Sequence, residues 1–287
     1  MATVSSILDS QVVPRKPLLT LRPSSGWSAI NFRDTWMFRD LMLSLGGRDL
    51  RLRYRQTALG VAWVILQPLM AAGIFTFVFG LVAKLPAGKS GYFMQTYASL
   101  LGWNAFFATI TKTSGCLLQN APLVSKVYFP RLVLPLSTVF STLVDFAIAL
   151  GLMIVMMPLH HIGFTYGILL IPIWLAMLIL MAMGIGLYAA ALGVSYRDVQ
   201  YVIPVLTQLL MYASPVGYTL DAVPARFRTL VMLNPLSGLL EAFRWSLLGT
   251  SSSHWMAILY STLVAFIAFF AGAIAFRRME RKFTDVI

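Results

Sequence analysis

Charged residues are scarce in this chain. Asp, Glu, Lys and Arg make up 11% of its 287 residues, only 10 residues are acidic, and the mean hydropathy is +0.79. Six stretches hold almost no charge: 56–83, 90–111, 132–159, 162–196, 199–220 and 255–276. Each is long enough for the ~20 helical residues that cross a bilayer core of roughly 30 Å. The sequence therefore predicts an all-α integral membrane protein with six transmembrane helices.

The predicted organisation has three parts. Residues 1–30 are rich in Pro and Ser and are expected to form a flexible arm. Residues 31–56 are expected to form a cytoplasmic amphipathic interface helix, and residues 57–287 a six-helix domain with a short cytoplasmic tail. The predicted spans are 57–83, 92–113, 132–158, 166–192, 199–219 and 255–276. The first 56 residues lack an apolar signal-peptide core, so the first span is expected to act as an uncleaved anchor.

Lys and Arg are distributed unevenly along this pattern. With a cytoplasmic N-terminus, the outside regions hold only Lys84, Lys89, Arg226, Arg228 and Arg244 of the 22 Lys and Arg residues. Cytoplasmic loops carry the excess of positive charge, so both termini are predicted to lie inside. The net charge of +12 is then mostly a topology signal. A nucleic-acid surface is disfavoured because the basic residues are spread over membrane flanks, where they attract anionic lipid.

The residue types of catalytic and metal sites are also scarce. Cys116 is the single cysteine, which excludes an internal disulfide and indicates a packing role. His160 and His161 have no nearby acid, so neither a metal site nor a catalytic site is expected. No nucleotide-binding motif is present, because Gly88-Lys89-Ser90 lacks the glycine that a phosphate loop needs at position 83. This pattern argues against an integral membrane enzyme.

Asp145 is the one acid inside a predicted span. An acid at this depth is a candidate functional residue, although a hydrogen-bonded packing role is favoured. Secondary transport driven by protons would need a chain of such groups, so a lone acid argues against it.

The predicted cytoplasmic side has two amphipathic elements. Trp36, Met37, Leu41 and Leu45 share one helical face, and Gly46-Gly47 is expected to break that helix. Arg48, Arg51, Arg53 and Arg55 follow, with three of them on one side. This segment either anchors the chain to lipid or contacts a cytoplasmic partner.

The second element is the inside loop 114–131. Asn120 is expected to cap a short helix near Pro122, and Pro130 to end it before the third span. Such a helix is either a simple connector or a coupling element docked on a motor.

The predicted outside region 221–254 holds an apolar run that is too short to span. Asn234 as N-cap and Pro235 at the first helical position indicate a second short helix, in which Glu241 and Arg244 can pair. Two short re-entrant helices on the outer side are therefore predicted.

Aromatic residues are abundant, with 19 Phe, 11 Tyr and 7 Trp. Rings that stack on sugar faces would suit a pore for a long glycan, whereas lipid-facing or interfacial positions are the ordinary alternative. The candidates for a channel lining are Trp63, Tyr97, Trp103, Tyr201 and Tyr212.

Five local segments together resemble one family. These are 48–69, 125–132, 195–199, 211–216 and 234–236, and the likeness extends over about 40–280. They resemble the permease subunit of an ABC-2 type polysaccharide exporter. The resemblance implies a homodimer bound to two separate ATPase subunits, which bind ATP and Mg, so that this chain needs no cofactor and no catalytic residue. It further implies export of a lipid-linked O-antigen, capsule or teichoic-acid chain across the bacterial inner membrane.

The resemblance also implies roles for particular residues. The interface helix with Arg48, Arg51, Arg53 and Arg55 and the first inside loop would contact the ATPase, and spans 1 and 5 would line the channel. The loop candidates for coupling are Asn120, Pro122, Lys126, Tyr128, Phe129 and Arg131. Asn234, Glu241 and Arg244 would belong to an outer gate. As a separate hypothesis, the four arginines attract the pyrophosphate of the lipid carrier.

Three alternatives remain open at this point. The chain could be an ABC-2 permease for a small lipid or drug, an integral membrane enzyme acting on lipid-linked sugars, or a membrane scaffold. The motif set favours the glycan exporter over all three.

Overall fold

The computed structural model describes residues 36–55, 60, 62–85, 90–250, 254–280 and 283, all within one compact unit, Phe32–Ile287. No strand occurs among these residues. The predicted arm 1–30 and the first residues of the predicted interface helix, 31–35, lie outside the described residues. The all-α class expected from the sequence is confirmed.

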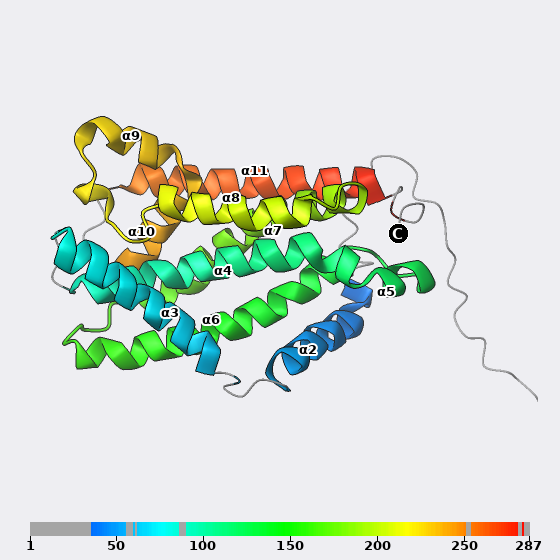
Figure 1. The fold of residues 1–287 in the computed structure, drawn as a ribbon, viewed down its shortest axis with the longest axis horizontal. Coiled ribbons are helices and arrows are strands. Elements are labelled where there is room, and N and C mark those ends of the chain that lie inside the picture. Colours follow the sequence, from blue (N-terminus) through cyan, green and yellow to red (C-terminus); the bar gives the residue numbers. More distant parts are fainter. Residues whose placement is uncertain are drawn as a thin grey trace, which may run out of the picture. The chain divides into compact units, whose positions relative to one another are not determined.

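The helices follow one another with short connections (Figure 1). The first half of the chain contains α2 (Arg39–Arg55), α3 (Ala62–Phe75) with a π-helical extension η1 (Thr76–Val82), α4 (Tyr92–Gln119), α5 (Ala121–Lys126) and α6 (Val133–Leu159). The second half contains η2 (Tyr166–Leu170), α7 (Ile171–Ser195), α8 (Val199–Ala213), η3 (Leu220–Ala222), α9 (Ala225–Leu233), α10 (Pro235–Leu248) and α11 (Trp255–Glu280). The short helices α5 and α9 lie at opposite ends of the bundle, which we call the α5 end and the α9 end.

Within the described part of the chain, four helical segments are long and apolar enough to cross a membrane. They are Ala62–Val82, Val133–Leu159, Tyr166–Ser195 and Trp255–Glu280, and they coincide with the predicted first, third, fourth and sixth spans. The predicted fifth span forms α8, a shorter apolar helix that ends at Ala213, so Pro204 lies inside it and Pro215 lies beyond it. The predicted second span forms α4, which is long enough but more polar.

The polar character of α4 follows from its central position. This helix packs against α3, α6, α7, α8 and α10, and most of its residues are buried. Its hydroxyl groups bond to carbonyls one turn earlier, as Ser99 does to Gln95 and Thr109 to Ala105. Neighbouring protein rather than lipid surrounds these polar groups, so the helix tolerates them. The largest fully buried side chains include Tyr97 and Phe106 of α4 itself, and Met153 and Phe243 of neighbouring helices.

Glycines allow close contact between α7 and α11. A Cβ atom added to Gly272 would lie 1.9 Å from the carbonyl oxygen of Gly184, and one added to Gly184 would lie 2.2 Å from that of Ala268. Small residues let two backbones approach in this way, and the close contact replaces the hydrophobic drive that lipid does not supply.

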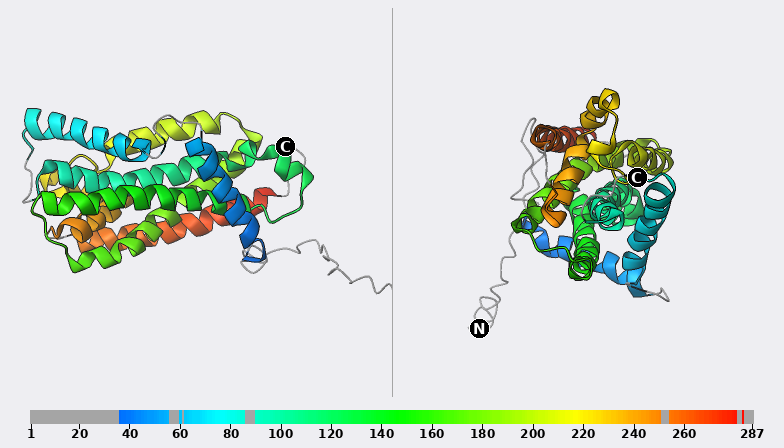
Figure 2. Two further views of the ribbon diagram at one scale, coloured as in Figure 1. Left: turned by 90° about the horizontal axis from the view of Figure 1, so that it is seen from below. Right: turned by 90° about the vertical axis from the view of Figure 1, so that its left-hand side faces the viewer.

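The interface helix α2 is continuous, so the predicted break at Gly46-Gly47 is wrong. The helix lies obliquely across α6, as Figure 2 shows. A Cβ added to Gly46 would come within 3.0 Å of both Phe140 Cβ and the Ser137 carbonyl, whereas one at Gly47 would meet nothing within 4 Å. Gly46 therefore serves close packing on α6 rather than helix termination.

Candidate functional site

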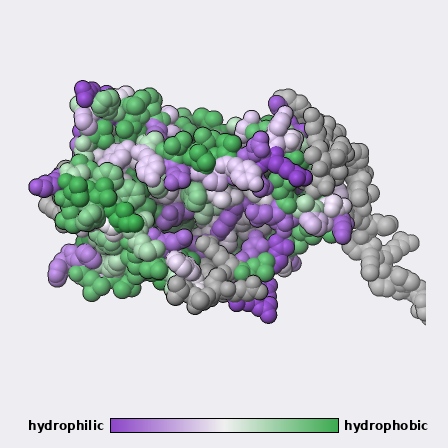
Figure 3. All heavy atoms as spheres, viewed as in Figure 1, coloured by the Kyte–Doolittle hydropathy of each residue, from purple (hydrophilic) through white to green (hydrophobic). Residues whose placement is uncertain are grey.

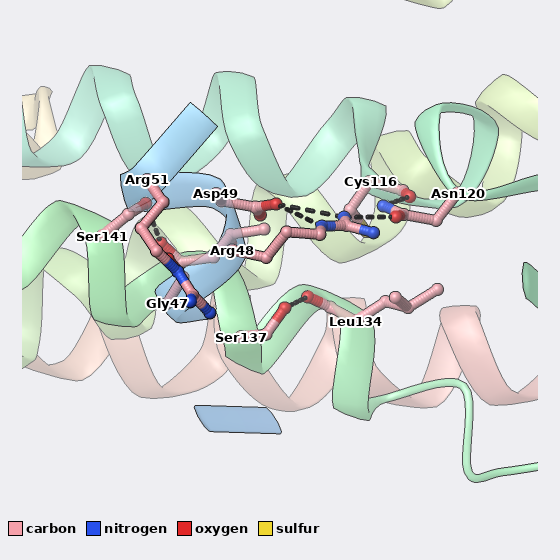
Figure 4. Close-up of polar contacts among 10 residues, drawn as sticks. Gly47, Arg48, Asp49, Arg51, Cys116, Asn120, Leu134, Ser137 and Ser141 are labelled. Atoms are coloured by element: carbon pink, nitrogen blue, oxygen red, sulfur yellow. Dashed lines mark hydrogen bonds and ion pairs between the residues drawn. The ribbon is translucent and has the colours of Figure 1, made fainter. Parts of the chain in front are cut away.

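A polar link joins α2 to the end of α4, as Figure 4 shows. The Arg48 guanidinium donates to the Asn120 side-chain oxygen at 2.7 Å and to the Asp49 carboxylate at 3.0 and 3.2 Å. Asn120 in turn donates through Nδ2 to the Cys116 carbonyl at 2.9 Å. Two elements that the sequence treats separately, the basic segment and the inside loop, are thus connected through one arginine.

Asn120 occupies the N-cap position of α5, but its side chain does not cap that helix. The predicted short helix is present as Ala121–Lys126, with Pro122 in its first turn. The expected cap bond is absent because the Asn120 oxygen accepts from Arg48 instead. The chain leaves α5 at Val127 in an extended conformation, three residues before Pro130.

The remaining coupling candidates differ in exposure. Lys126 and Tyr128 are exposed, and 66% of Tyr128 is accessible, so both are available to a partner. Phe129 is buried and acts as an anchor for this segment. Arg131 is half-buried beside Glu280 at the end of α11. At the α5 end, Phe129 and Arg131 therefore pack into the fold, while Lys126 and Tyr128 remain exposed.

Two of the other arginines in the basic segment are exposed. Arg51 donates to the Gly47 carbonyl at 3.2 Å, which is a local contact within α2. Arg55 is exposed at the last residue of the helix. Arg53 belongs to α2, but its side chain lies outside the described residues.

Asp145 has a basic partner. Its carboxylate pairs with the Lys112 ammonium at 3.2 Å, and the same ammonium donates to the Ser141 hydroxyl at 2.8 Å. Lys112 belongs to α4 and Asp145 to α6, so the pair crosses the interface between two helices. The sequence pattern alone did not pair Asp145 with Lys112, because such a contact between two helices depends on the rotation of each helix.

A second polar cluster lies toward the α9 end, around Arg244. This side chain is buried and forms an ion pair with Glu241, which confirms the expected pairing within α10. Its Nη1 also donates to the carbonyls of Pro215 and Tyr218 at 2.9 Å each and to the Ser99 hydroxyl at 3.2 Å. One guanidinium thus ties α10 to α4 and to the chain after α8.

Asn234 starts α10 as expected. Its side-chain oxygen accepts from the Leu236 backbone N–H at 3.0 Å, which confirms the predicted cap, with Pro235 at the first helical position. Its Nδ2 donates to the Ser214 hydroxyl at 2.8 Å. Asn234 and Arg244 therefore both bond to the turn 214–218.

The channel candidates fall into two groups. Tyr97 and Trp103 are buried within the chain, and the Tyr97 hydroxyl donates to the Ala149 carbonyl at 3.1 Å. Trp63, Tyr201 and Tyr212 are exposed, the last two by more than half. Sequence alone could not separate the groups, because it does not specify the rotation of each helix.

No group of three or more His, Cys, Asp or Glu side chains that could hold a metal ion occurs among the described residues. On the face drawn in Figure 3, hydrophobic side chains cover α3 and hydrophilic ones gather toward α2 and α5.

Comparisons with known proteins place this geometry in context. A family model described as "ABC-2 type transporter" matches residues 41–248, from within α2 to the last residue of α10. The chain is 26% identical to an O-antigen export system permease protein of Klebsiella pneumoniae over 253 residues, 86% of this chain and 95% of that protein. It is 28% identical to an O-antigen export system permease protein of Myxococcus xanthus, over 74% of this chain and 82% of the relative. It is 25% identical to a polysialic acid transport protein of Escherichia coli, over 81% and 91%.

Proposed function

The chain belongs to the ABC-2 type transporter family, and we propose that it is the transmembrane subunit of an ATP-driven exporter that moves a lipid-linked polysaccharide across the bacterial inner membrane. The observation that carries the proposal is the similarity to O-antigen export permeases over 82% to 95% of their length. The multi-pass character of the chain agrees with the four apolar spanning helices.

The proposed topology has six spans with both termini in the cytoplasm. Besides the four apolar spans, α4 and α8 cross the membrane, α4 shielded by its neighbours and α8 as a shorter helix. The α5 end is cytoplasmic, since the basic segment of α2 lies there. The helices α9 and α10 at the opposite end are re-entrant from the outer side, and the Arg244 cluster holds α10 against the turn after α8.

The proposed assembly is a homodimer with two ATPase subunits, which bind ATP and Mg. Figure 2 shows α3 and α8 along one side of the bundle. On α8 the exposed Tyr201, Val205, Leu209 and Tyr212 recur at helical spacing and form one apolar face. We propose that this face of α8 and the helix α3, which carries Trp63, both face the partner protomer and line the glycan path. Their aromatic rings would stack on the sugar faces.

In the proposed coupling mechanism the ATPase docks on α5 and the exposed residues after it. A displacement of α5 reaches α4 directly and reaches α2 through the Arg48–Asn120 bond, so both helices respond together. Because Arg48 is engaged in this link, Arg51 and Arg55 are the better candidates for attracting the lipid pyrophosphate. Charge reversal at these two that weakens ATPase binding but leaves lipid-substrate binding intact would refute the pyrophosphate role.

The test is purification with the ATPase encoded beside this chain, followed by ATP hydrolysis in lipid nanodiscs. We expect a complex of two copies of each subunit that hydrolyses ATP. Lys126→Glu, at an exposed position, should abolish recruitment, whereas Lys84→Glu, exposed near the opposite end, should not. Lys126 is the better probe than Arg131, because a reversed charge at 131 would meet Glu280 within the fold. A chain that never recruits an ATPase would overturn the proposal.

A further inference from the structure

The short helix α9 has a face that no other part of the described chain covers. None of its nine residues is buried, its main packing contacts are with α10 and η3, and it lies at the edge of the bundle (Figure 1). Arg226, Leu230 and Leu233 recur at the spacing of one helical face. Leu230 is 68% exposed and Leu233 60%, and the neighbouring Phe227 is 48% exposed. An apolar face of this kind indicates a partner other than water.

Two contacts determine how α9 runs relative to the spanning helix α11. In the first turns of α9, Arg228 donates to the Asp221 carbonyl at 3.3 Å, and the Asp221 carboxylate lies 4.0 Å from Nε2 of His254, the residue before α11. At the end of α9, the Leu233 carbonyl accepts from the Tyr260 hydroxyl at 3.1 Å. The six positions from His254 to Tyr260 correspond to about 9 Å along a helix axis. The basic end of α9 therefore lies toward the beginning of α11, and its leucine end lies farther along α11.

The exposed side of α11 indicates what surrounds this face. α11 is one of the apolar spanning segments, and its exposed Met256, Leu259 and Leu263 begin a stripe that faces away from the bundle. Trp255, the first residue of α11, is 51% exposed and is of the type that occurs at the membrane–water interface. Tyr260, which contacts α9, is itself 39% exposed. The apolar face of α9 therefore continues the lipid-facing surface of α11, close to the interface.

Arg226 brings a positive charge to this surface. Its guanidinium carbon lies 4.6 Å from the centre of the Phe227 ring, and no hydrogen bond or ion pair involves this guanidinium within the described part of the chain. Arg228, by contrast, donates to the backbone carbonyls of Asp221 and Val223. At the level of the lipid head groups, the planar guanidinium of Arg226 can bind a phosphate through two parallel hydrogen bonds.

We propose that α9 binds an anionic phospholipid of the outer leaflet, with the lipid phosphate at Arg226 and an acyl chain along Leu230 and Leu233. An anionic head group fits better than a zwitterionic one, because it offsets the charge of Arg226 and brings no second cation to the site. The bound lipid bridges α9 to α11. The choice of leaflet rests on the proposed topology, whereas the lipid contact itself does not depend on ATPase recruitment.

The experiment places the full chain in nanodiscs with equal amounts of phosphatidylglycerol and phosphatidylcholine of matched acyl chains. Leu230→Cys carries a fluorophore, and the native Cys116 is buried and stays unlabelled. A nitroxide on the acyl chains of one lipid at a time quenches the fluorophore on contact. The local ratio of phosphatidylglycerol to phosphatidylcholine should be about five, because one arginine near an anionic membrane surface contributes a factor of about that size.

Substitutions at Arg226 test the role of its charge. In the labelled chain, Arg226→Gln should bring the ratio to about one, whereas Arg226→Lys should retain most of the preference and thereby show that the face is still formed. The matched control is Lys84→Gln, which removes an exposed cation outside α9 and should leave the full preference. A preference that persists in Arg226→Gln would overturn the proposal.

The unsubstituted Arg226 chain provides three further outcomes that would overturn it. Equal quenching by the two lipids would show an unselective contact with the bilayer. No quenching by either lipid would show that water or a second copy of the chain covers this face, and the emission wavelength distinguishes these two. Loss of the preference when an equal amount of a polyisoprenyl diphosphate is added would identify the surface as a site for the carrier lipid.

Discussion

Replacing Arg244 with Met should destabilise the fold strongly. The guanidinium is 2% exposed and bonds to Glu241, Pro215, Tyr218 and Ser99. Its removal leaves the Glu241 carboxylate buried without its partner, and breaking a buried pair in this way costs about 3–5 kcal/mol. For a chain of this size, that loss corresponds to a fall in the unfolding midpoint on the order of 10 °C.

The chain contains its own reporter for this measurement. Cys116 is the single cysteine and is buried, so a thiol-reactive fluorophore signals unfolding in detergent. Arg226→Met is the control, because Arg226 is exposed and lies over the Phe227 ring at 4.6 Å, a contact worth about 0.5–1 kcal/mol. A double variant, Arg244→Met with Glu241→Leu, should recover part of the loss, since no charge is then stranded. Equal midpoints for Arg244→Met and Arg226→Met would refute the reasoning.

Three further predictions use the same assay or hydrogen exchange. Gly272→Ala should lower the unfolding midpoint much more than Gly151→Ala does. A Cβ at position 272 would lie 1.9 Å from backbone, whereas a Cβ at position 151 would meet nothing within 4 Å. Similar unfolding midpoints for the two variants would contradict the close contact between α7 and α11. Gly46→Val should cost about 1–3 kcal/mol by overpacking α2 on α6, while Gly47→Ala should be neutral or stabilising by up to about 1 kcal/mol. Asn120→Ala should speed amide exchange in α2, since that helix loses a 2.7 Å bond; unchanged exchange would show that packing alone holds it.

Part of the candidate site was predictable because it depends on neighbours in sequence. The Asn234 cap, the short helix near Pro122 and the Glu241–Arg244 pair each involve residues a few positions apart. Local backbone geometry determines such contacts. The Gly46-Gly47 break was predicted wrongly for the same reason, because helix propensity carries no information on the α6 surface that Gly46 contacts.

The sequence by itself determined the class of this protein. Its uncharged stretches are longer than a bilayer core requires, and inside the bilayer a helix satisfies the hydrogen bonds of the backbone. The charged residues that flank these stretches indicate the orientation of the chain. Only the tertiary structure decided which groups meet across helices. Arg48 reaches Asn120 over 72 positions, Lys112 reaches Asp145 over 33, and Tyr97 faces inward while Tyr212 faces outward. Each outcome depends on the rotation and crossing of whole helices, which are set by the packing of many side chains at once and not by any local pattern.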